Sequence, residues 1–381
     1  MTVVREIPSA GELHPIGSIS VSDAEQLLSC SLRVVFNSDR TLREMRPVVA
    51  SALLGTAAHN ALASMARAAR SENRAADTQT KSPTRQIAQE TFDAALKALC
   101  EKRDIKIAER GPVPGESAEA PEELPFYAIA RARFVRFARK RLGDDWLWKS
   151  PRPLVHGVSE HSRSSTIAEG VHAEVPLHST DGRLRGIADS IVVLSDDVAI
   201  EEFKTGELTP QRIPAWTLQL ALYGHLYEQK YRVRPSVLRI HSIGGATHEV
   251  AYDQRTADAE VERVRTALST LNDVIGAGVR AQDLAAPTEG ACSHCSHRAW
   301  CEAYWTSPVP RLAGTDLDGV VTKTDGWKVF LLRSDHTIIV VDFRWYGCLP
   351  QQGQHLRVCN ARMGRDQALL VDRSTSVWGL R

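Results

Sequence analysis

Neither positive nor negative charge dominates this 381-residue sequence, because Lys and Arg total 47 and Asp and Glu total 46. Any surface that binds a polyanion must therefore come from local clusters of basic residues and not from net charge. Long hydrophobic runs are also missing: no apolar stretch approaches the roughly 18 residues of a membrane span. The amino terminus, MTVVREIPSAGELHP, lacks the basic region and apolar core of a signal peptide. We therefore expect a cytoplasmic protein without membrane contact.

The pattern along the chain predicts an α/β fold followed by a small all-β domain. Helical periodicity marks VSDAEQLLSCSLRVVFNSD, entered through Ser22 or Asp23, and the alanine-rich RPVVASALLGTAAHNALASMARAAR. Strand-like segments follow in GVHAEVPLHS, GRLRGIADSIVVLS and DVAIEEFK, then a helix, AWTLQLALYGHLYEQKY, and a strand, PSVLRIHSI. Short β-rich runs begin near residue 312. We expect one domain over 1–310 and an OB-like β-barrel over 311–381.

A basic segment runs from Phe126 to Trp148. Its cations, interleaved with Phe134 and Phe137, are Arg131, Arg133, Arg136, Arg139, Lys140 and Arg141. A helix of this kind could follow a phosphate backbone, or it could be the solvated side of an amphipathic helix. The sequence leaves both interpretations open.

Three charged residues fall on mainly apolar strand faces. Because side chains alternate along a strand, one face carries Ile187, Asp189, Ile191 and Val193, and one face of the next strand carries Val198, Ile200, Glu202 and Lys204. The intervening SDD is a turn candidate. A two-residue loop would place Asp189 opposite Lys204, and a four-residue loop would place it opposite Glu202. Glu201 is expected to face away and to be inert.

Charges on an apolar face cost several kcal/mol unless they are paired or bind a cation. Carboxylate oxygens suit Mg²⁺ or Mn²⁺, so Asp189 and Glu202 are the candidate ligands. Lys204 would orient a water molecule or stabilise negative charge that develops at phosphorus. The alternative is an ordinary charged pair that closes a strand.

The order GIAD, then EFKTG with its glutamate thirteen positions after Asp189, resembles the PD-(D/E)XK nuclease superfamily, and KTG resembles its RecB-like branch. The resemblance implies a restriction-endonuclease-like mixed sheet flanked by helices. Gln219 and Tyr223 in QLALY are similar to the QxxxY motif of this branch, which implies DNA contact, although a tyrosine among leucines could also be core. His59, four after Gly55, resembles the GxxxH element, which implies a role in binding Mg²⁺ or Mn²⁺. Glu174 resembles the acidic residue on the preceding strand.

Seven cysteines would be unusual disulfide material in a reducing compartment, so those with close spacing point first to metal. Cys292, Cys295 and Cys301 form C-x2-C-x5-C, which can present three thiolates to one centre. The fourth ligand could be His294 or His297 in a zinc site, or Cys30.

One amino-terminal cysteine with a carboxy-terminal C-x2-C-x5-C resembles the iron–sulfur nucleases of the same branch, including the AddB subunit and CRISPR-associated exonucleases. Ser31 stands where that family usually has proline. The resemblance favours a 4Fe-4S cluster over zinc, held by Cys30, Cys292, Cys295 and Cys301, and closing this long loop would stabilise the fold. The other cysteines, Cys100, Cys348 and Cys359, are interpreted as structural.

The leading hypothesis is a metal-dependent DNA nuclease, an exonuclease on single strands or DNA ends, acting in DNA repair, antiviral defence or CRISPR adaptation. The alternative is a non-catalytic iron–sulfur subunit that binds DNA or serves as a scaffold. Because no P-loop is visible, unwinding would need a partner such as a helicase. In the terminal β region, Trp327, Phe330, Phe343, Trp345 and Tyr346 could stack on unpaired bases or could form the core.

Overall fold

The computed structural model describes residues 4–8, 12–75, 85–143, 167–194, 197–293, 295–307, 316–346, 348–364, 368–372 and 375–380. Within these ranges the helices are α1 (Val21–Ser29), α2 (Ser31–Ser38), α3 (Arg40–Glu44), α4 (Ala50–Ala75), α5 (Arg85–Arg110), α6 (Tyr127–Gly143), α7 (Ile213–Tyr231), α8 (Gln254–Gly276), α9 (Glu289–Ser293) and α10 (Glu302–Thr306). None of these helices is long and apolar enough to cross a membrane.

The strands fall into two sheets. The first contains β2 (Ile19–Ser20), β3 (Gly170–His178), β4 (Leu184–Leu194), β5 (Asp197–Lys204), β6 (Val237–Ser242) and β7 (Thr247–Ala251). The second contains β1 (Arg5–Glu6), β8 (Leu317–Asp325), β9 (Lys328–Leu332), β10 (Ile338–Asp342), β11 (His355–Cys359), β12 (Arg362–Met363), β13 (Leu369–Leu370) and β14 (Ser376–Leu380).

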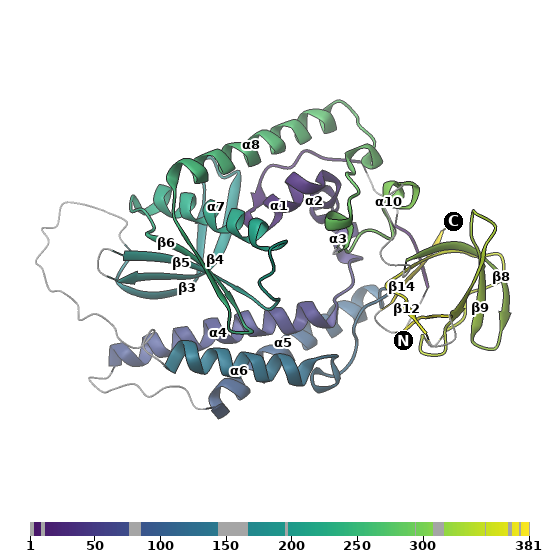
Figure 1. The fold of residues 1–381 in the computed structure, drawn as a ribbon, viewed down its shortest axis with the longest axis horizontal. Coiled ribbons are helices and arrows are strands. Elements are labelled where there is room, and N and C mark those ends of the chain that lie inside the picture. The colour runs from purple at the N-terminus through teal and green to yellow at the C-terminus, as the bar shows by residue number, and fades with distance from the viewer. Residues whose placement is uncertain are drawn as a thin grey trace, which may run out of the picture.

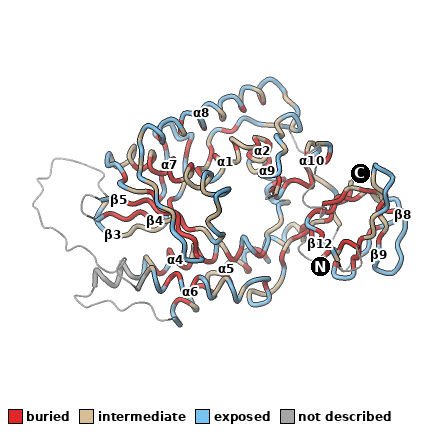
Figure 2. The backbone as a smooth tube through the Cα atoms, in the orientation of Figure 1, coloured by how far each residue is buried: buried red, intermediate tan, exposed pale blue. Residues whose placement is uncertain are grey.

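The first sheet is mixed and lies between two helical layers (Figure 1). Its order is β2-β4-β5-β6-β7, with β3 paired to β4; β4 and β5 are antiparallel, and β5 and β6 are parallel. Helices α7 and α8 pack on one face and α4, α5 and α6 on the other (Figure 1). The expected α/β fold, a mixed sheet flanked by helices, is confirmed, and the buried strands form its centre (Figure 2).

The helix predicted from Ser22 or Asp23 onward is in fact two helices. Ser20 caps α1, because its hydroxyl accepts a hydrogen bond from the Asp23 N–H at 3.1 Å. At Cys30 the backbone becomes extended, with φ −162° and ψ 97°, and α2 begins at the next residue. The break matters because Cys30 is one of the predicted ligands.

The basic segment forms α6, and residues 144–148 of the prediction lie outside the described ranges. Phe134 and Phe137 are buried against α4 and α5, and Arg131 is bonded to Asp93 at 2.6 Å. The exposed cations of the helix are Arg133, Arg136, Arg139 and Lys140. The structure therefore combines the two interpretations: the aromatic residues are core, and four cations remain on a solvated face.

The second sheet has the order β1-β14-β11-β8-β9-β10-β13-β12 in the described residues and its own core. It includes the amino-terminal strand β1, which pairs in parallel with β14. The predicted all-β character of this region is confirmed, whereas its likeness to an OB barrel stays a prediction. The aromatic residues divide: Phe343 and Tyr346 are fully buried, and Trp327 and Trp345 are 48% and 65% exposed.

Candidate active site

The alternation predicted for β5 is confirmed. Val198 and Ile200 pack in the core beneath α7, and Glu202 and Lys204 continue that face toward the end of the strand. Phe203 packs into the opposite core with α4 and α6. Glu202 is 4% exposed, so its carboxylate lies inside the protein and is not part of a solvated pair.

The alternation predicted for β4 is wrong near Asp189. Ile187 is 58% exposed, whereas Ala188 and Ile191 are both fully buried in the same core, so the inward side changes parity between them. The pairing of β3 with β4 skips Asp189 and its neighbour Glu174, which has a left-handed φ of 52°. This local irregularity releases Asp189 from regular pairing.

The hairpin register brings Asp189 toward Glu202. Ser190 pairs with Glu201, and Leu194 pairs with Asp197. Two residues therefore lie between the two strands in the chain. The sequence argument linked this register to a four-residue loop, and that link is wrong because Leu194 and Asp197 still pair. In this register Asp189 lies near enough to Glu202 for its charge to raise the pKa of Glu202.

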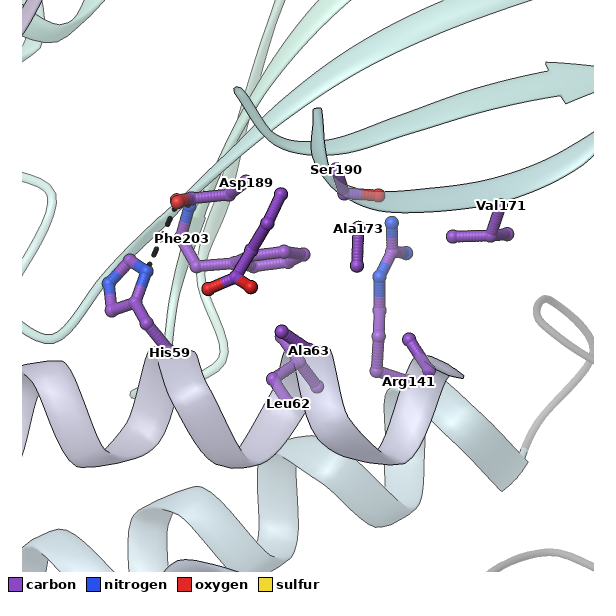
Figure 3. Close-up of a pocket in the computed structure, with 11 residues that line it drawn as sticks. His59, Leu62, Ala63, Arg141, Val171, Ala173, Asp189, Ser190 and Phe203 are labelled. Carbon is purple, nitrogen blue, oxygen red and sulfur yellow. Dashed lines mark hydrogen bonds and ion pairs between the residues drawn. The ribbon is translucent and has the colours of Figure 1, made fainter. Parts of the chain in front are cut away.

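His59 reaches the hairpin from α4. Its Nδ1 lies 3.2 Å from Asp189 Oδ1, and a dashed line marks this contact in Figure 3. The backbone N–H of Phe203 donates to Asp189 Oδ2 at 2.8 Å. Burial lowers the pKa of His59, but the hydrogen bond and the charge of Asp189 outweigh it, and the pKa rises above its usual value. A Cβ on Gly55 would lie 3.5 Å from the Thr205 hydroxyl, so the two sequence motifs meet in space.

Lys204 is held by a network that includes helix α7. Its Nζ donates to Glu202 Oε1 at 2.7 Å and to Gln219 Oε1 at 2.9 Å. The Gln219 amide donates to the same Glu202 oxygen at 2.8 Å. The ring of Trp216 lies 5.7 Å from Lys204 Nζ, a cation–π contact that the sequence argument missed. The sequence feature that could have predicted this contact is the spacing of three residues between Trp216 and Gln219, which places both on one side of the helix.

Tyr223 is buried beneath β4. Its hydroxyl donates to the carbonyl of Ile187 at 2.8 Å, and a Cβ on Gly186 would lie 2.6 Å from the tyrosine ring. These contacts favour a role in positioning the strand that carries Asp189. DNA contact by Gln219 and Tyr223 stays a prediction.

The ionised form of Glu202 is destabilised by its surroundings. Burial raises its pKa to about 7, and the charge of Asp189 adds to that effect against the favourable Lys204 pair. Its second oxygen, Oε2, is buried without a hydrogen-bond partner among the described residues. A buried carboxylate oxygen in this state suits a cation that the carboxylate can bind.

This raised pKa predicts a pH-dependent stability of the metal-free protein. Because the folded pKa of about 7 exceeds the usual value of 4.5, the folded state binds the proton more tightly than the unfolded state. The contribution of Glu202 to the free energy of unfolding is therefore fully present below pH ~4.5 and is lost as the pH rises through ~7. Melting curves in EDTA should show this dependence for the wild type relative to Glu202→Gln. Parallel pH profiles would contradict it.

Glu201 faces away from Glu202, as predicted, but it is not solvated. It is fully buried, and Arg141 Nη2 from α6 lies 2.5 Å from its Oε1. His241 and Arg239 lie 3.4 Å and 3.7 Å from the same oxygen. Burial raises the pKa of Glu201, but His241 and Arg141 outweigh it and hold the pKa below its usual value. Glu201 therefore lies outside the Glu202 network, and its expected inertness stays a prediction.

Glu174 lines the same pocket as His59 and Asp189. Its Oε2 accepts a hydrogen bond from Arg67 Nη1 at 2.7 Å. In the described part of the chain, no three His, Cys, Asp or Glu side chains are grouped so that they could hold a metal ion as they stand. Asp189 and His59 are bonded to each other instead, so the fit to a cation rests on the unpartnered oxygen of Glu202.

The four predicted cysteine ligands line one cavity. Cys30 comes from the break between α1 and α2, and Cys292, Cys295 and Cys301 come from the segment around α9 and α10. Burial raises the pKa of Cys301 to about 12 and also raises the pKa values of Cys292 and Cys295; each of these three thiols is further affected by the charge of Cys30. A shared cavity explains how residues from both ends of the domain influence one another.

Polar donors surround these sulfur atoms. The backbone N–H of Ala286 donates to Cys30 Sγ at 3.5 Å, and backbone hydrogen bonds from His297 and Tyr304 to Cys295 and Cys301 oppose the rise in pKa that burial causes. Such donors stabilise thiolates, the form that binds metal.

The structure describes only one of the two histidines that could complete a zinc site. His294 lies outside the described residues. His297 lines the cavity, and burial lowers its pKa to about 3. Its Nε2 lies 2.9 Å from Asn37 Oδ1, while Nδ1 has no hydrogen-bond partner in the described ranges. The alternative ligand set with a histidine therefore stays open.

The family follows from a comparison with known proteins. The model of the PD-(D/E)XK nuclease superfamily matches residues 18–302, and the chain belongs to this superfamily. Its members are generally nucleases, that is, phosphodiester hydrolases, and they typically use divalent metals such as Mg²⁺ or Mn²⁺.

The other comparisons are weaker. No curated protein matches the chain. A solved structure, "Crystal structure of SSO0001", aligns with 35% of this chain and 61% of its own length, at 18% identity and a TM-score of 0.22. The aligned part therefore spans less than two thirds of that protein.

Proposed function

We propose that the protein is a metal-dependent DNA nuclease that acts on single strands or DNA ends. The observation that carries this proposal is the buried Glu202, which is bonded to Lys204 through one oxygen and has no partner for the other. Glu202 also lies near Asp189 and His59. The candidate metal ligands and the charge-stabilising group Lys204 therefore meet at one end of β5. Family membership supports the reaction class.

In this mechanism, Asp189, Glu202 and His59 would hold Mg²⁺ or Mn²⁺. The ion would lower the pKa of a water molecule and polarise the phosphoryl oxygens. The ammonium group of Lys204, fixed by Gln219 and Glu202, stabilises negative charge as it develops at phosphorus. Tyr223 keeps the Asp189 strand in place through the Ile187 carbonyl.

We also infer that Cys30, Cys292, Cys295 and Cys301 hold a 4Fe-4S cluster. The support for this proposal is that the four thiols line one cavity although Cys30 lies far from the other three in sequence. The cluster would join the first helices to the end of the nuclease domain.

The test of the proposed function is cleavage of 5′- and 3′-blocked single-stranded oligonucleotides by anaerobically purified protein. We expect cleavage with Mn²⁺ or Mg²⁺ that stops in EDTA. The terminal block that prevents cleavage identifies the end at which the enzyme starts. Roles in DNA repair, antiviral defence or CRISPR adaptation, and a helicase partner, are part of the same proposal.

The alternative function is a non-catalytic iron–sulfur subunit that binds DNA or serves as a scaffold. The retention of Asp189, Glu202 and Lys204 in one network counts against it. DNA binding without divalent-dependent cleavage under reducing, anaerobic conditions would favour it.

The terminal sheet supplies a further predicted contact with unpaired bases. Trp327 and Trp345 are exposed at the same end of the β9–β10 pair, where the N–H of Phe343 donates to the Trp327 carbonyl at 2.8 Å. Replacing both tryptophans with Ala should weaken binding of single-stranded DNA by about tenfold or more, since each stacked base contributes roughly 1–3 kcal/mol. Fluorescence anisotropy in a Lys204→Ala background measures this affinity.

The matched control for the tryptophans is Ile338→Ala. Ile338 is 58% exposed at the other end of the same strand pair, so its loss should not alter affinity. Equal affinities for the double tryptophan variant and the control would contradict the stacking role.

A further inference from the structure

Helix α6 has an exposed side that is strongly basic. Three of its exposed cations, Arg133, Arg136 and Lys140, follow one another at spacings of three and four residues, which places them along one side of the helix. The helix contains no Asp or Glu. Its apolar side packs against α4 and α5, so the basic side faces the solvent.

These three cations are unpaired, unlike other cations of the same helix. Arg131 is bonded to Asp93 at 2.6 Å, and Arg141 is bonded to Glu201 at 2.5 Å. Within the described part of the chain, the side chains of the three make no ion pair or hydrogen bond. Their positive charge is therefore available to an anion outside the protein.

The basic side begins next to the candidate active site. Arg141, which directly follows Lys140, lines the same pocket as His59 and Asp189 (Figure 3). Between Lys140 and Arg133 the helix covers about 10 Å at a rise of 1.5 Å per residue. This is the axial length of about three phosphates in one strand of B-form DNA. Three cations are thus available over the length of three phosphates.

The start of α6 adds exposed apolar side chains. Ile129, four residues before Arg133, is 52% exposed, and Phe126, directly before the helix, is 71% exposed. Phe126 has a φ of 66°, a backbone conformation that few residues other than glycine adopt. A basic track combined with exposed aromatic rings is typical of surfaces that bind unpaired strands. Phosphates account for the cations, and an unpaired base accounts for the exposed ring.

We propose that the DNA strand beyond the scissile phosphate lies along this side of α6. Its phosphates contact Arg133, Arg136 and Lys140, and an unpaired base stacks on Phe126. The inference rests on the proposed nuclease function and identifies a second part of its substrate. Because phosphate contacts carry no sequence information, this surface binds strands of any sequence.

The test of the phosphate contacts is the salt dependence of binding. Fluorescence anisotropy of labelled oligothymidylate, in a Lys204→Ala background, gives the affinity at a series of salt concentrations. Replacing Arg133, Arg136 and Lys140 together with Gln should make the slope of log affinity against log salt concentration shallower by about 2. The reason is that each phosphate contact on a single strand contributes about 0.7 to that slope.

The matched control is the triple variant Arg255→Gln, Arg263→Gln and Arg265→Gln on α8, which covers the other face of the sheet (Figure 1). It removes the same number of positive charges and should retain the slope of the Lys204→Ala parent. If the α6 triple variant fails to fold, as judged by thermal melting, Arg136→Gln alone should make the slope shallower by about 0.7.

A second measurement tests the contact with an unpaired base. Phe126→Ala should weaken binding of single-stranded DNA by about tenfold and leave binding of duplex DNA unchanged. Phe126→Tyr keeps an aromatic ring and should retain the affinity. The control is Ile105→Ala on α5, because Ile105 is 58% exposed and lies outside the proposed surface.

The outcomes separate this proposal from the nuclease function. Equal slopes for the α6 variant, the α8 variant and the parent would overturn the strand path, as would a parent that binds no DNA. Equal single-strand affinities of Phe126→Ala and the parent would overturn the base contact. A shallower slope for the α6 variant alone, in a protein whose wild type cleaves no DNA, would support the path and count against the nuclease.

Discussion

Replacing Glu202 with Gln should abolish Mn²⁺-dependent cleavage of end-labelled single-stranded DNA, with a loss of about 10³-fold or more. The amide keeps the shape of the side chain and removes the negative charge that the buried site has available for a cation. Lys204→Ala should cause a loss of about 10²–10³-fold, because it removes the ammonium group that faces Glu202 and Gln219.

The comparison needs a glutamate outside this network. Glu249 on β7 has a side chain that is 57% exposed and pairs with Arg239 at the surface, so Glu249→Gln should cleave at the wild-type rate. Undiminished cleavage by Glu202→Gln or Lys204→Ala would eliminate these residues as the catalytic centre. Melting curves of all three variants distinguish loss of chemistry from loss of fold.

Replacing Cys295 with Ser should remove the brown colour and broad absorbance near ~400 nm expected of an iron–sulfur cluster. It should also lower the free energy of unfolding by about 5 kcal/mol, the size of effect that closing a long loop provides. The reason is that Cys30 and the other three ligands lie far apart in sequence but line one cavity.

Cys348→Ser is the matched control, because Cys348 is half-buried and does not line that cavity. It should retain both the spectrum and the stability. Ultraviolet–visible spectra, metal analysis and chemical denaturation of anaerobically purified protein make the comparison. A colourless wild type that contains one zinc ion per chain would establish the zinc alternative, with His297 available as the fourth ligand.

Much of the fold could be predicted from local patterns. The alternation of Val198, Ile200 and Glu202 identified the face of β5 that packs beneath α7, because that side requires apolar residues. The spacing of four between Gln219 and Tyr223 placed both on one helix face. These predictions depend only on backbone periodicity, which a sequence expresses directly.

Other features depended on interruptions of that periodicity. The reversal of inward side between Ala188 and Ile191 follows from the skipped pairing at Asp189 and Glu174, and no residue type in GIAD announces it. The break at Cys30 was likewise hidden within an apolar pattern that suits a continuous helix.

The sequence by itself determined the candidate chemistry: Asp189, Glu202 and Lys204 on neighbouring strands, His59 upstream, and four cysteines with metal-ligand spacing. Only the tertiary structure decided how these groups meet. It showed that Glu202 is buried with one unpartnered oxygen, that Glu201 is buried in a separate ion-pair cluster with Arg141, and that Trp216 covers Lys204. The physical reason is that desolvation and pairing depend on neighbours distant in sequence, whereas alternation and spacing are properties of the local chain.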